Sequence, residues 1–165
     1  FVNAVRATGG NNETRNLIIN TYAAANGDDV LNNLAIPTDK VNGHIAVEVH
    51  TYDPWDWFAQ KGKWDASCSN DIKNMFTRLN NKFISKGIPC IIGEYGTHGS
   101  KSVSKNSSAS EIQAAADQAA DIVKQAKVYG VATFYWMSIF DGTDRSMPQW
   151  TLSTVVEAMK KAYNE

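Results

Sequence analysis

A single glutamate ends the most apolar short segment of this chain. The segment Ile88-Pro89-Cys90-Ile91-Ile92-Gly93-Glu94-Tyr95-Gly96 is an apolar run closed by glycines, a pattern typical of a buried parallel strand. A carboxylate at the C-terminal end of such a strand lies where α/β barrels place their chemistry. Glu94 is therefore predicted to be catalytic; the alternative is a solvated loop glutamate or a structural ion pair.

A second polar group follows another apolar segment, Ile45–Thr51. His50 and Tyr52 share strand parity, so they are expected to point to the same side, and in a barrel they converge on the same mouth as Glu94. Each can hydrogen-bond a sugar hydroxyl or hold a carboxylate in place, whereas a histidine bonded to a backbone carbonyl is the structural alternative. Glu48 shares this parity and needs a partner, yet no Lys or Arg in the sequence is an obvious one.

Tryptophans lie within one further strand candidate and in the loop after another. Trp136 lies in the apolar segment 131–139, and Trp55 and Trp57 follow Tyr52 in the next loop. Aromatic side chains commonly line ligand clefts, and the apolar face of a pyranose packs well on an indole. We therefore predict that Trp136, Trp55 and Trp57 bind a sugar polymer. The alternatives are a core tryptophan at 136 and loop tryptophans that seal the loop onto the barrel.

The elements that position these residues alternate between strand and helix. Strands are expected at 17–22, 45–51, 88–93 and 131–139. A helix end is expected at 1–8, one helical turn at 30–34, and helices at 70–85, from a capping box beginning at Ser110 up to Gly130, and at 151–163. This alternation predicts βαβ units, a parallel sheet and the α/β class. No linker divides the chain, so residues 1–165 are predicted to form one structural unit.

Composition excludes several classes of function. The 165 residues carry a net charge of −1, which gives no electrostatic case for nucleic acid or an anionic membrane surface. No apolar run has the length of a transmembrane helix, and no signal peptide is recognised. The sequence shows no dinucleotide, Walker or serine-elbow motif and no metal-ligand spacing, so no cofactor or metal is expected. Cys68 and Cys90 are expected at opposite ends of a helix–strand layer and hence unpaired.

The motifs and their order resemble glycoside hydrolase family 5, the cellulase family A. Ile91-Ile92-Gly93-Glu94-Tyr95-Gly96 resembles the seventh-strand motif that holds the nucleophile of that family. His50-Thr51-Tyr52 resembles its sixth-strand pair, and Trp136 its eighth-strand substrate platform. The segments 6–12 and 47–55 are similar to the subgroup that contains endoglucanases, lichenases and xyloglucanases. The resemblance runs through the whole chain.

The resemblance implies strands five to eight of a (β/α)8 TIM barrel, that is, a half-barrel. It implies a retaining endo-β-1,4-glucanase in which Glu94 is the nucleophile, Tyr52 hydrogen-bonds it and His50 contacts the sugar. The acid/base glutamate of the family follows an Asn at the end of the fourth strand, and this chain has no such pair; Asn12-Glu13 falls in a helix-to-strand loop. The expected partners are a β-glucan and either an N-terminal half-barrel or a second copy. The resemblance also implies an extracellular enzyme. A non-catalytic half-barrel, for assembly or glycan binding, is the alternative.

Overall fold

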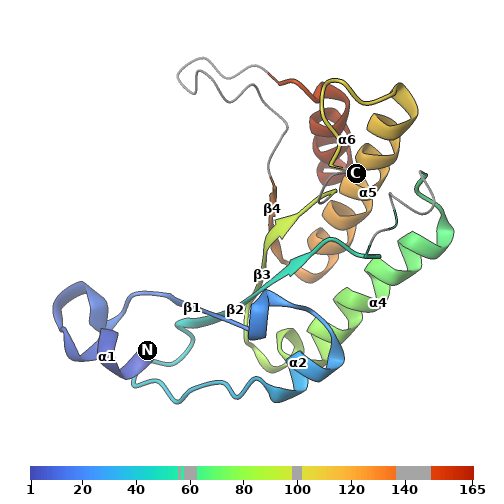
Figure 1. Cartoon of the computed structure of the whole chain (residues 1–165). Coiled ribbons are helices and arrows are strands. Elements are labelled where there is room, and N and C mark those ends of the chain that lie inside the picture. The colour runs from blue at the N-terminus through green and yellow to red at the C-terminus, as the bar shows by residue number, and fades with distance from the viewer. Residues whose placement is uncertain (56, 58–62, 98–101, 137–149) are drawn as a thin grey trace.

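Four parallel strands form a sheet in the order β1-β2-β3-β4 (Figure 1). They are β1 (Leu17–Asn20), β2 (Ile45–Thr51), β3 (Cys90–Tyr95) and β4 (Ala132–Tyr135). The computed structural model describes residues 1–55, 57, 63–97, 102–136 and 150–165. Because neighbours in the sheet are neighbours in the sequence and run in parallel, each connection must cross over the sheet. The predicted parallel α/β half-barrel is confirmed; positions 137–139 of the expected last strand lie outside the described residues.

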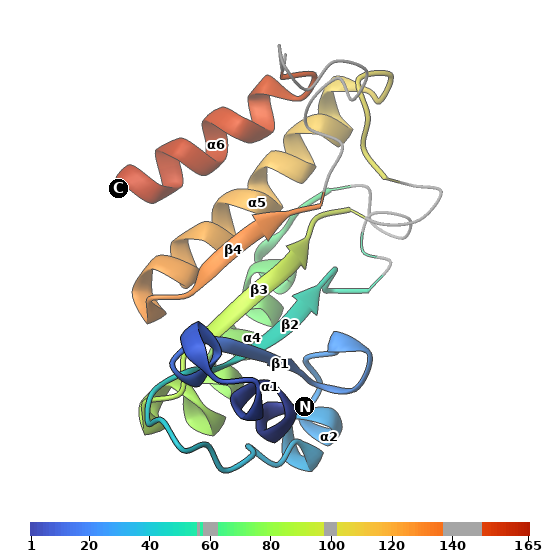
Figure 2. The same cartoon turned by 90° about the vertical axis from the view of Figure 1, so that its left-hand side faces the viewer.

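Three long helices cover one face of this sheet (Figures 1 and 2). They are α4 (Ala66–Lys82), α5 (Ala109–Tyr129) and α6 (Ser153–Asn164). The shorter elements are α1 (Val2–Ala7), α2 (Asp28–Asn33) and the 3-10 turns η1 (Gly10–Glu13), η2 (Tyr22–Ala24) and η3 (Ile84–Lys86). No helix in the described residues is long and apolar enough to cross a membrane. Cys68 and Cys90 are both buried and free, as expected.

Two helix starts differ from the sequence-based expectation because caps lie further upstream. The Asp65 side chain accepts from the backbone N–H groups of Ser67 and Cys68, so α4 begins four residues before the expected start at 70. The capping box of α5 is formed by Ser108 and Glu111, not by a box beginning at Ser110. In both cases a short acceptor side chain satisfies the free N–H groups of a first turn.

The sheet is covered on one face and open on the other. Val47 and Val49 of β2 are fully buried against the helices, whereas residues of opposite parity face the open side, onto which Figure 2 looks. Ile18 of β1 and Phe134 of β4 are 45% and 59% exposed. Strand alternation thus places apolar side chains on the open face, where they lack the cover that the helices give the other face.

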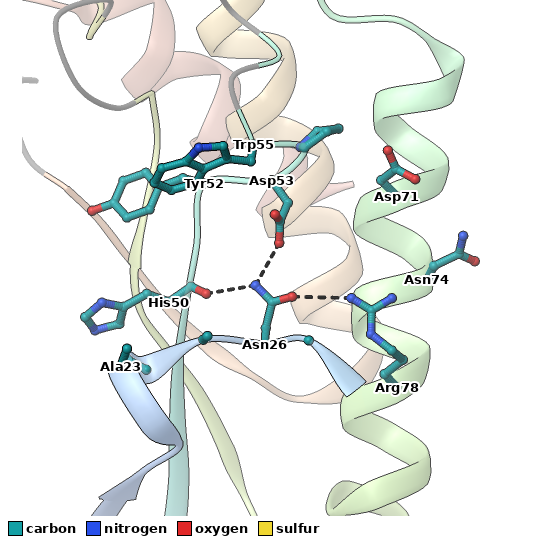
Figure 3. A pocket seen from close by; sticks show the side chains of 13 residues that line it. Ala23, Asn26, His50, Tyr52, Asp53, Trp55, Asp71, Asn74 and Arg78 are labelled. Atoms are coloured by element: carbon teal, nitrogen blue, oxygen red, sulfur yellow. Dashed lines mark hydrogen bonds between the residues drawn. The ribbon is translucent and has the colours of Figure 1, made fainter. Parts of the chain in front are cut away.

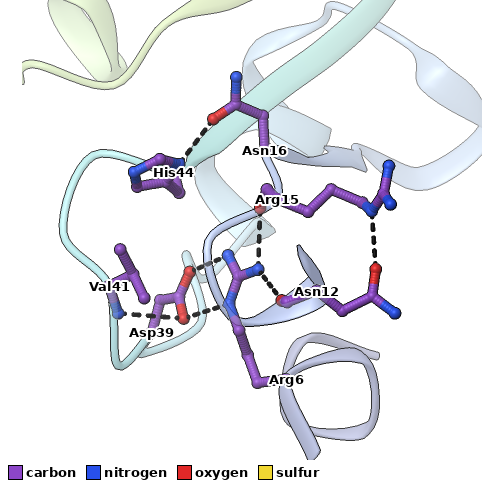
Figure 4. A network of polar contacts seen from close by, with 7 residues as sticks. All are labelled: Arg6, Asn12, Arg15, Asn16, Asp39, Val41 and His44. Carbon is purple, nitrogen blue, oxygen red and sulfur yellow. Dashed lines mark hydrogen bonds and ion pairs between the residues drawn. The ribbon is translucent and has the colours of Figure 1, made fainter. Parts of the chain in front are cut away.

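A buried ion pair ties the N-terminal segment to the loop before β2 (Figure 4). The Arg6 guanidinium donates to Asp39 at 2.9 and 2.6 Å, and to the backbone carbonyls of Asn12 at 2.7 Å and Arg15 at 2.8 Å. The hydrogen bond from Arg6 lowers the pKa of Asp39 to about 2. One guanidinium therefore joins α1, η1 and the loop at residue 39, and so positions the start of β1.

Candidate active site

An irregularity in β3 sets the direction of the Glu94 side chain. Val49 of β2 pairs with Ile92, but the next residue, His50, pairs with Glu94, so Gly93 is an extra residue on β3. Such a bulge re-aims the side chains that follow it. Ile92 and Tyr95, which precede and follow the pair Gly93 and Glu94, are both buried on the helix side. Glu94 therefore comes to lie on the open face, beside His50.

Tyr52, His50 and Glu94 are in contact at the C-terminal ends of β2 and β3. The Tyr52 hydroxyl donates to Glu94 Oε2 at 2.6 Å, and His50 Nδ1 lies 3.3 Å from the same oxygen. Among the described residues, no hydrogen bond reaches Glu94 Oε1. The Glu94 side chain is 24% exposed. The Tyr52 hydroxyl thus holds Glu94 Oε2, His50 lies close to the same oxygen, and Oε1 accepts no hydrogen bond from the described residues.

The Tyr52 phenol is a donor over a wide pH range. Burial, followed by the hydrogen bond to Glu94, raises the pKa of Tyr52 well above its usual range. Both causes disfavour phenolate. A protonated phenol therefore faces the carboxylate, as the predicted role of Tyr52 requires.

Glu48 has partners that sequence reasoning missed. Its Oε2 accepts from the Asn20 side chain at 3.0 Å, and its Oε1 lies 3.4 Å from His50 Nε2. Asn20 is the last residue of β1 and is paired with Glu48 in the register of the two strands. The sequence does contain one indication that Asn20 belongs to the site, because Asn20 is a polar residue at the end of an apolar strand.

Asn26 secures the end of β2 from the neighbouring loop (Figure 3). Its side-chain amide donates to the His50 carbonyl at 3.0 Å and to Asp53 Oδ2 at 2.7 Å, and its carbonyl accepts from Arg78 of α4 at 3.3 Å. These groups border a cavity of about 700 Å³ that also includes Tyr52 and is open to solvent. No catalytic motif marks Asn26 in the sequence, and only the fold brings it to this position.

The three predicted sugar-binding tryptophans occupy different environments. Trp136 is 51% exposed directly after β4 and donates its backbone N–H to the Tyr95 carbonyl at 2.9 Å, which places it next to the end of β3. Trp55 is 64% exposed and lines the cavity. Trp57, in contrast, is 3% exposed and packs edge-on against Trp64 at 4.9 Å between ring centroids. Trp57 therefore packs against α4 and α5 beside Cys68 and Ala114 and leaves little ring surface for a sugar, in line with the structural alternative.

Gly96 allows the chain after Glu94 to pass close to β4. Its φ of +149° is unfavourable for other residues, and a Cβ there would lie 2.9 Å from the Trp136 carbonyl oxygen. A glycine is thus required for Trp136 to sit beside this strand end. Within the described ranges, His, Cys, Asp and Glu side chains form no group that could hold a metal ion.

Comparison with known sequences places the chain in one enzyme family. The family model for cellulase (glycosyl hydrolase family 5) matches residues 1–142. Endoglucanase A of Ruminococcus albus is 30% identical over 176 residues, an alignment that covers 96% of this chain and 45% of that protein. Endoglucanase B of Neocallimastix patriciarum is 40% identical over 99 residues, covering 58% of this chain and 20% of that protein. The chain thus spans less than half the length of these curated relatives.

Solved structures similar to this chain belong to the same enzyme family. A glycoside hydrolase family 5 enzyme from Prevotella bryantii B14 superposes with a TM-score of 0.94 and 63% identity over 99% of this chain and 47% of that chain. A variant of that enzyme was solved in complex with a xyloglucan tetradecasaccharide. A broad specificity endoglucanase from an uncultured bacterium gives a TM-score of 0.81 at 41% identity, covering 100% of this chain and 45% of that chain. The chain therefore belongs to the cellulase family, glycoside hydrolase family 5, and its four-stranded parallel sheet corresponds to half of the (β/α)8 barrel of that family.

Proposed function

We propose that this chain forms half of the catalytic domain of a retaining endo-β-1,4-glucanase and carries its nucleophile, Glu94. The hydrogen bond of 2.6 Å from Tyr52 to Glu94 Oε2, at the strand ends of a family 5 half-barrel, is the observation that carries the proposal. A nucleophilic carboxylate must be ionised and held in one orientation. A neutral phenol that donates to one of its oxygens supports both requirements.

The proposed reaction gives each carboxylate oxygen of Glu94 a different role. Oε2 accepts from Tyr52 and faces His50, so Oε1 is the oxygen that attacks the anomeric carbon. A new C–O bond forms between Oε1 and that carbon while the bond to the leaving oxygen breaks. Water then attacks the same carbon, and Glu94 leaves as a carboxylate. Two successive displacements retain the anomeric configuration.

A second carboxylic acid must protonate the leaving oxygen and then, as a carboxylate, accept a proton from the attacking water. Retaining enzymes place it about 5 Å from the nucleophile. Glu48 lies below His50 on β2 and is held by Asn20, while Glu13 belongs to η1, before β1. Glu48 is on the open face but lies below the strand end, and Glu13 is not on the sheet. We therefore assign the acid/base to the other half of the barrel. Four further strands and their loops would form that half.

The open sheet is the surface that this other half would cover. Ile18 and Phe134 lie exposed at its two edge strands, and unpaired strand edges with apolar side chains favour association. The matched Ruminococcus albus and Prevotella bryantii enzymes are about twice as long as this chain, so the proposed occupant is the remaining half-barrel. A second copy of this chain is the competing occupant. The proposed substrate is a β-glucan, with Trp136 and Trp55 as sugar platforms, and because such a polymer is met outside the cell we propose an extracellular enzyme.

A joined enzyme tests the proposal. The first half of the Prevotella bryantii enzyme is fused to this chain, and the product, hereafter the joined enzyme, is assayed on xyloglucan, mixed-linkage glucan, carboxymethyl cellulose and xylan. We expect hydrolysis with retained anomeric configuration by NMR. Glu94→Gln should lower kcat by about 10⁴-fold or more at unchanged thermal stability, whereas Glu157→Gln, at an exposed site on α6, serves as the matched control.

The outcomes separate the two functional readings. Near-normal turnover by Glu94→Gln would remove Glu94 from the nucleophile role. A folded joined enzyme that binds β-glucan without hydrolysing it would favour the non-catalytic reading, a glycan-binding or assembly half-barrel.

A further inference from the structure

Glu48 is a carboxylate on the open face that the proposed reaction does not use. It lies two residues before His50 on β2, and its side chain is 24% exposed. Oε2 accepts from Asn20 at 3.0 Å, and Oε1 lies 3.4 Å from His50 Nε2. Because Asn20 fixes one oxygen, the other is presented to the imidazole in a defined position.

The imidazole of His50 is therefore flanked by two carboxylates. Nε2 faces Glu48 and Nδ1 faces Glu94 Oε2 at 3.3 Å. A neutral imidazole has one N–H and presents it to one of the two carboxylates; only the imidazolium presents an N–H to both. The hydrogen-bond partner of one ring nitrogen determines whether the other ring nitrogen carries a proton. Glu48 therefore influences whether the Nδ1 atom of His50, which faces Glu94, carries a proton.

The bulge residue Gly93 makes room for Glu48. A Cβ built on Gly93 would lie 1.6 Å from Glu48 Oε1 and 2.5 Å from its Cδ, distances that no side chain can adopt. A glycine inside a strand often marks such a close approach. The residue that re-aims Glu94 is therefore also the residue that admits the Glu48 carboxylate, so the two features belong to one local arrangement.

We propose that Glu48 is a positioning residue that sets the orientation and proton placement of the His50 ring beside Glu94. This rests on the proposed function, since Glu94 is taken as the nucleophile. Glu48 lies two residue pairs deeper in the sheet than His50, away from the strand ends where a sugar would bind. It acts on the reaction through His50 and not by touching the substrate.

The test uses kcat and KM of the joined enzyme. Glu48→Gln keeps the size of the side chain and removes its charge. We expect kcat on mixed-linkage glucan to fall by about 10- to 100-fold, as for other groups that orient a histidine, with KM changed less than about twofold. Glu48→Asp, which keeps the charge, should recover part of the loss. Wild-type kcat in both Glu48→Gln and Glu48→Ser would overturn the proposal.

A second pair of variants tests the same arrangement without turnover. Gly93→Ala alone should lower the thermal midpoint, because the methyl group meets the Glu48 carboxylate. Adding Glu48→Ser should restore the midpoint while kcat stays low. Equal midpoints for Gly93→Ala in the presence and absence of Glu48 would contradict the placement of this side chain.

The failure of this inference is distinguishable from that of the proposed function. If the joined enzyme hydrolyses β-glucan and Glu48→Gln changes nothing, the inference alone fails. If the folded joined enzyme is inactive on every glucan, the proposed function fails. In that case the ring-nitrogen chemical shifts of His50, assigned with His50→Asn, still report whether Glu48→Gln changes the proton on Nε2; unchanged shifts reject the inference.

Discussion

The Tyr52 hydroxyl and Glu94 Oε2 are joined by a hydrogen bond of 2.6 Å between residues 42 positions apart in the sequence. The two strands that carry them are adjacent in the sheet, with His50 paired to Glu94. The distance is that of a charge-assisted O–H···O bond. It links the end of β2 to the proposed nucleophile on β3.

Removing this hydroxyl should impair catalysis without unfolding the protein. Hydrogen bonds to charged groups contribute about 1.5–3 kcal/mol, so Tyr52→Phe in the joined enzyme should lower kcat by about 10- to 100-fold. Steady-state kinetics with a soluble β-glucan measures the effect. Tyr163→Phe, at a residue 65% exposed on α6, is the matched control. An unchanged kcat for Tyr52→Phe would mean that the bond does not act on the reaction.

The two tryptophans at 136 and 57 should respond in opposite ways to truncation. Trp136 is half exposed at a strand end, so Trp136→Ala should raise KM several-fold and leave stability nearly unchanged. Trp57 is buried, so Trp57→Ala should lower the free energy of unfolding by about 3–5 kcal/mol. Paired thermal and kinetic measurements on the joined enzyme separate the two effects. A large KM effect from Trp57→Ala in a fully folded enzyme would restore that residue as a sugar contact.

The ion pair between Arg6 and Asp39 predicts a pH-dependent contribution to stability. The pKa of Asp39 is lowered from 3.8 to about 2 in the folded protein. The contribution is therefore fully present above the unfolded value and is lost as pH falls through the folded value. The difference in thermal midpoint between wild type and Asp39→Asn should be largest above about pH 5 and shrink on acidification. Asp28→Asn, at a largely exposed position, is the matched control.

The position of the α5 cap can be tested with two serines. Ser108 accepts from the Glu111 N–H, and Glu111 accepts from the Ser108 N–H. Ser108→Ala should therefore cost about 1 kcal/mol of unfolding free energy. Ser110→Ala, at the position that sequence patterning favoured, should change stability by less than about 0.5 kcal/mol. Urea denaturation compares the two variants, and the reverse order would return the cap to Ser110.

The open sheet predicts association when the chain is produced alone. Sedimentation should show self-association, because Ile18 and Phe134 are exposed on edge strands. Addition of the separately produced first half of the Prevotella bryantii enzyme should convert the sample to a heterodimer. A stable monomer that does not bind the added half would contradict the proposal that a second half-barrel covers the open face of the sheet.

Sequence patterning located the strands well because buried strands carry continuous apolar runs. The expected strand 45–51 agrees with β2, and the expected strand 88–93 overlaps β3. Helix starts were less predictable. A single capping side chain decides where a first turn begins, and both α4 and α5 have such a side chain outside the expected segment.

The residue types of the site and their order can be read from the sequence: a glutamate after one apolar strand, a His-x-Tyr pair after another, and a tryptophan at the end of a third. Which way these side chains point was decided only by tertiary structure. Regular alternation from the buried Ile92 would turn Glu94 into the helix-facing core. The extra residue at Gly93 reverses that parity because a bulge is defined by pairing between two strands and not by either strand alone. The pairing of β1 with β2 likewise brings Asn20 opposite Glu48, a contact that no local pattern contains.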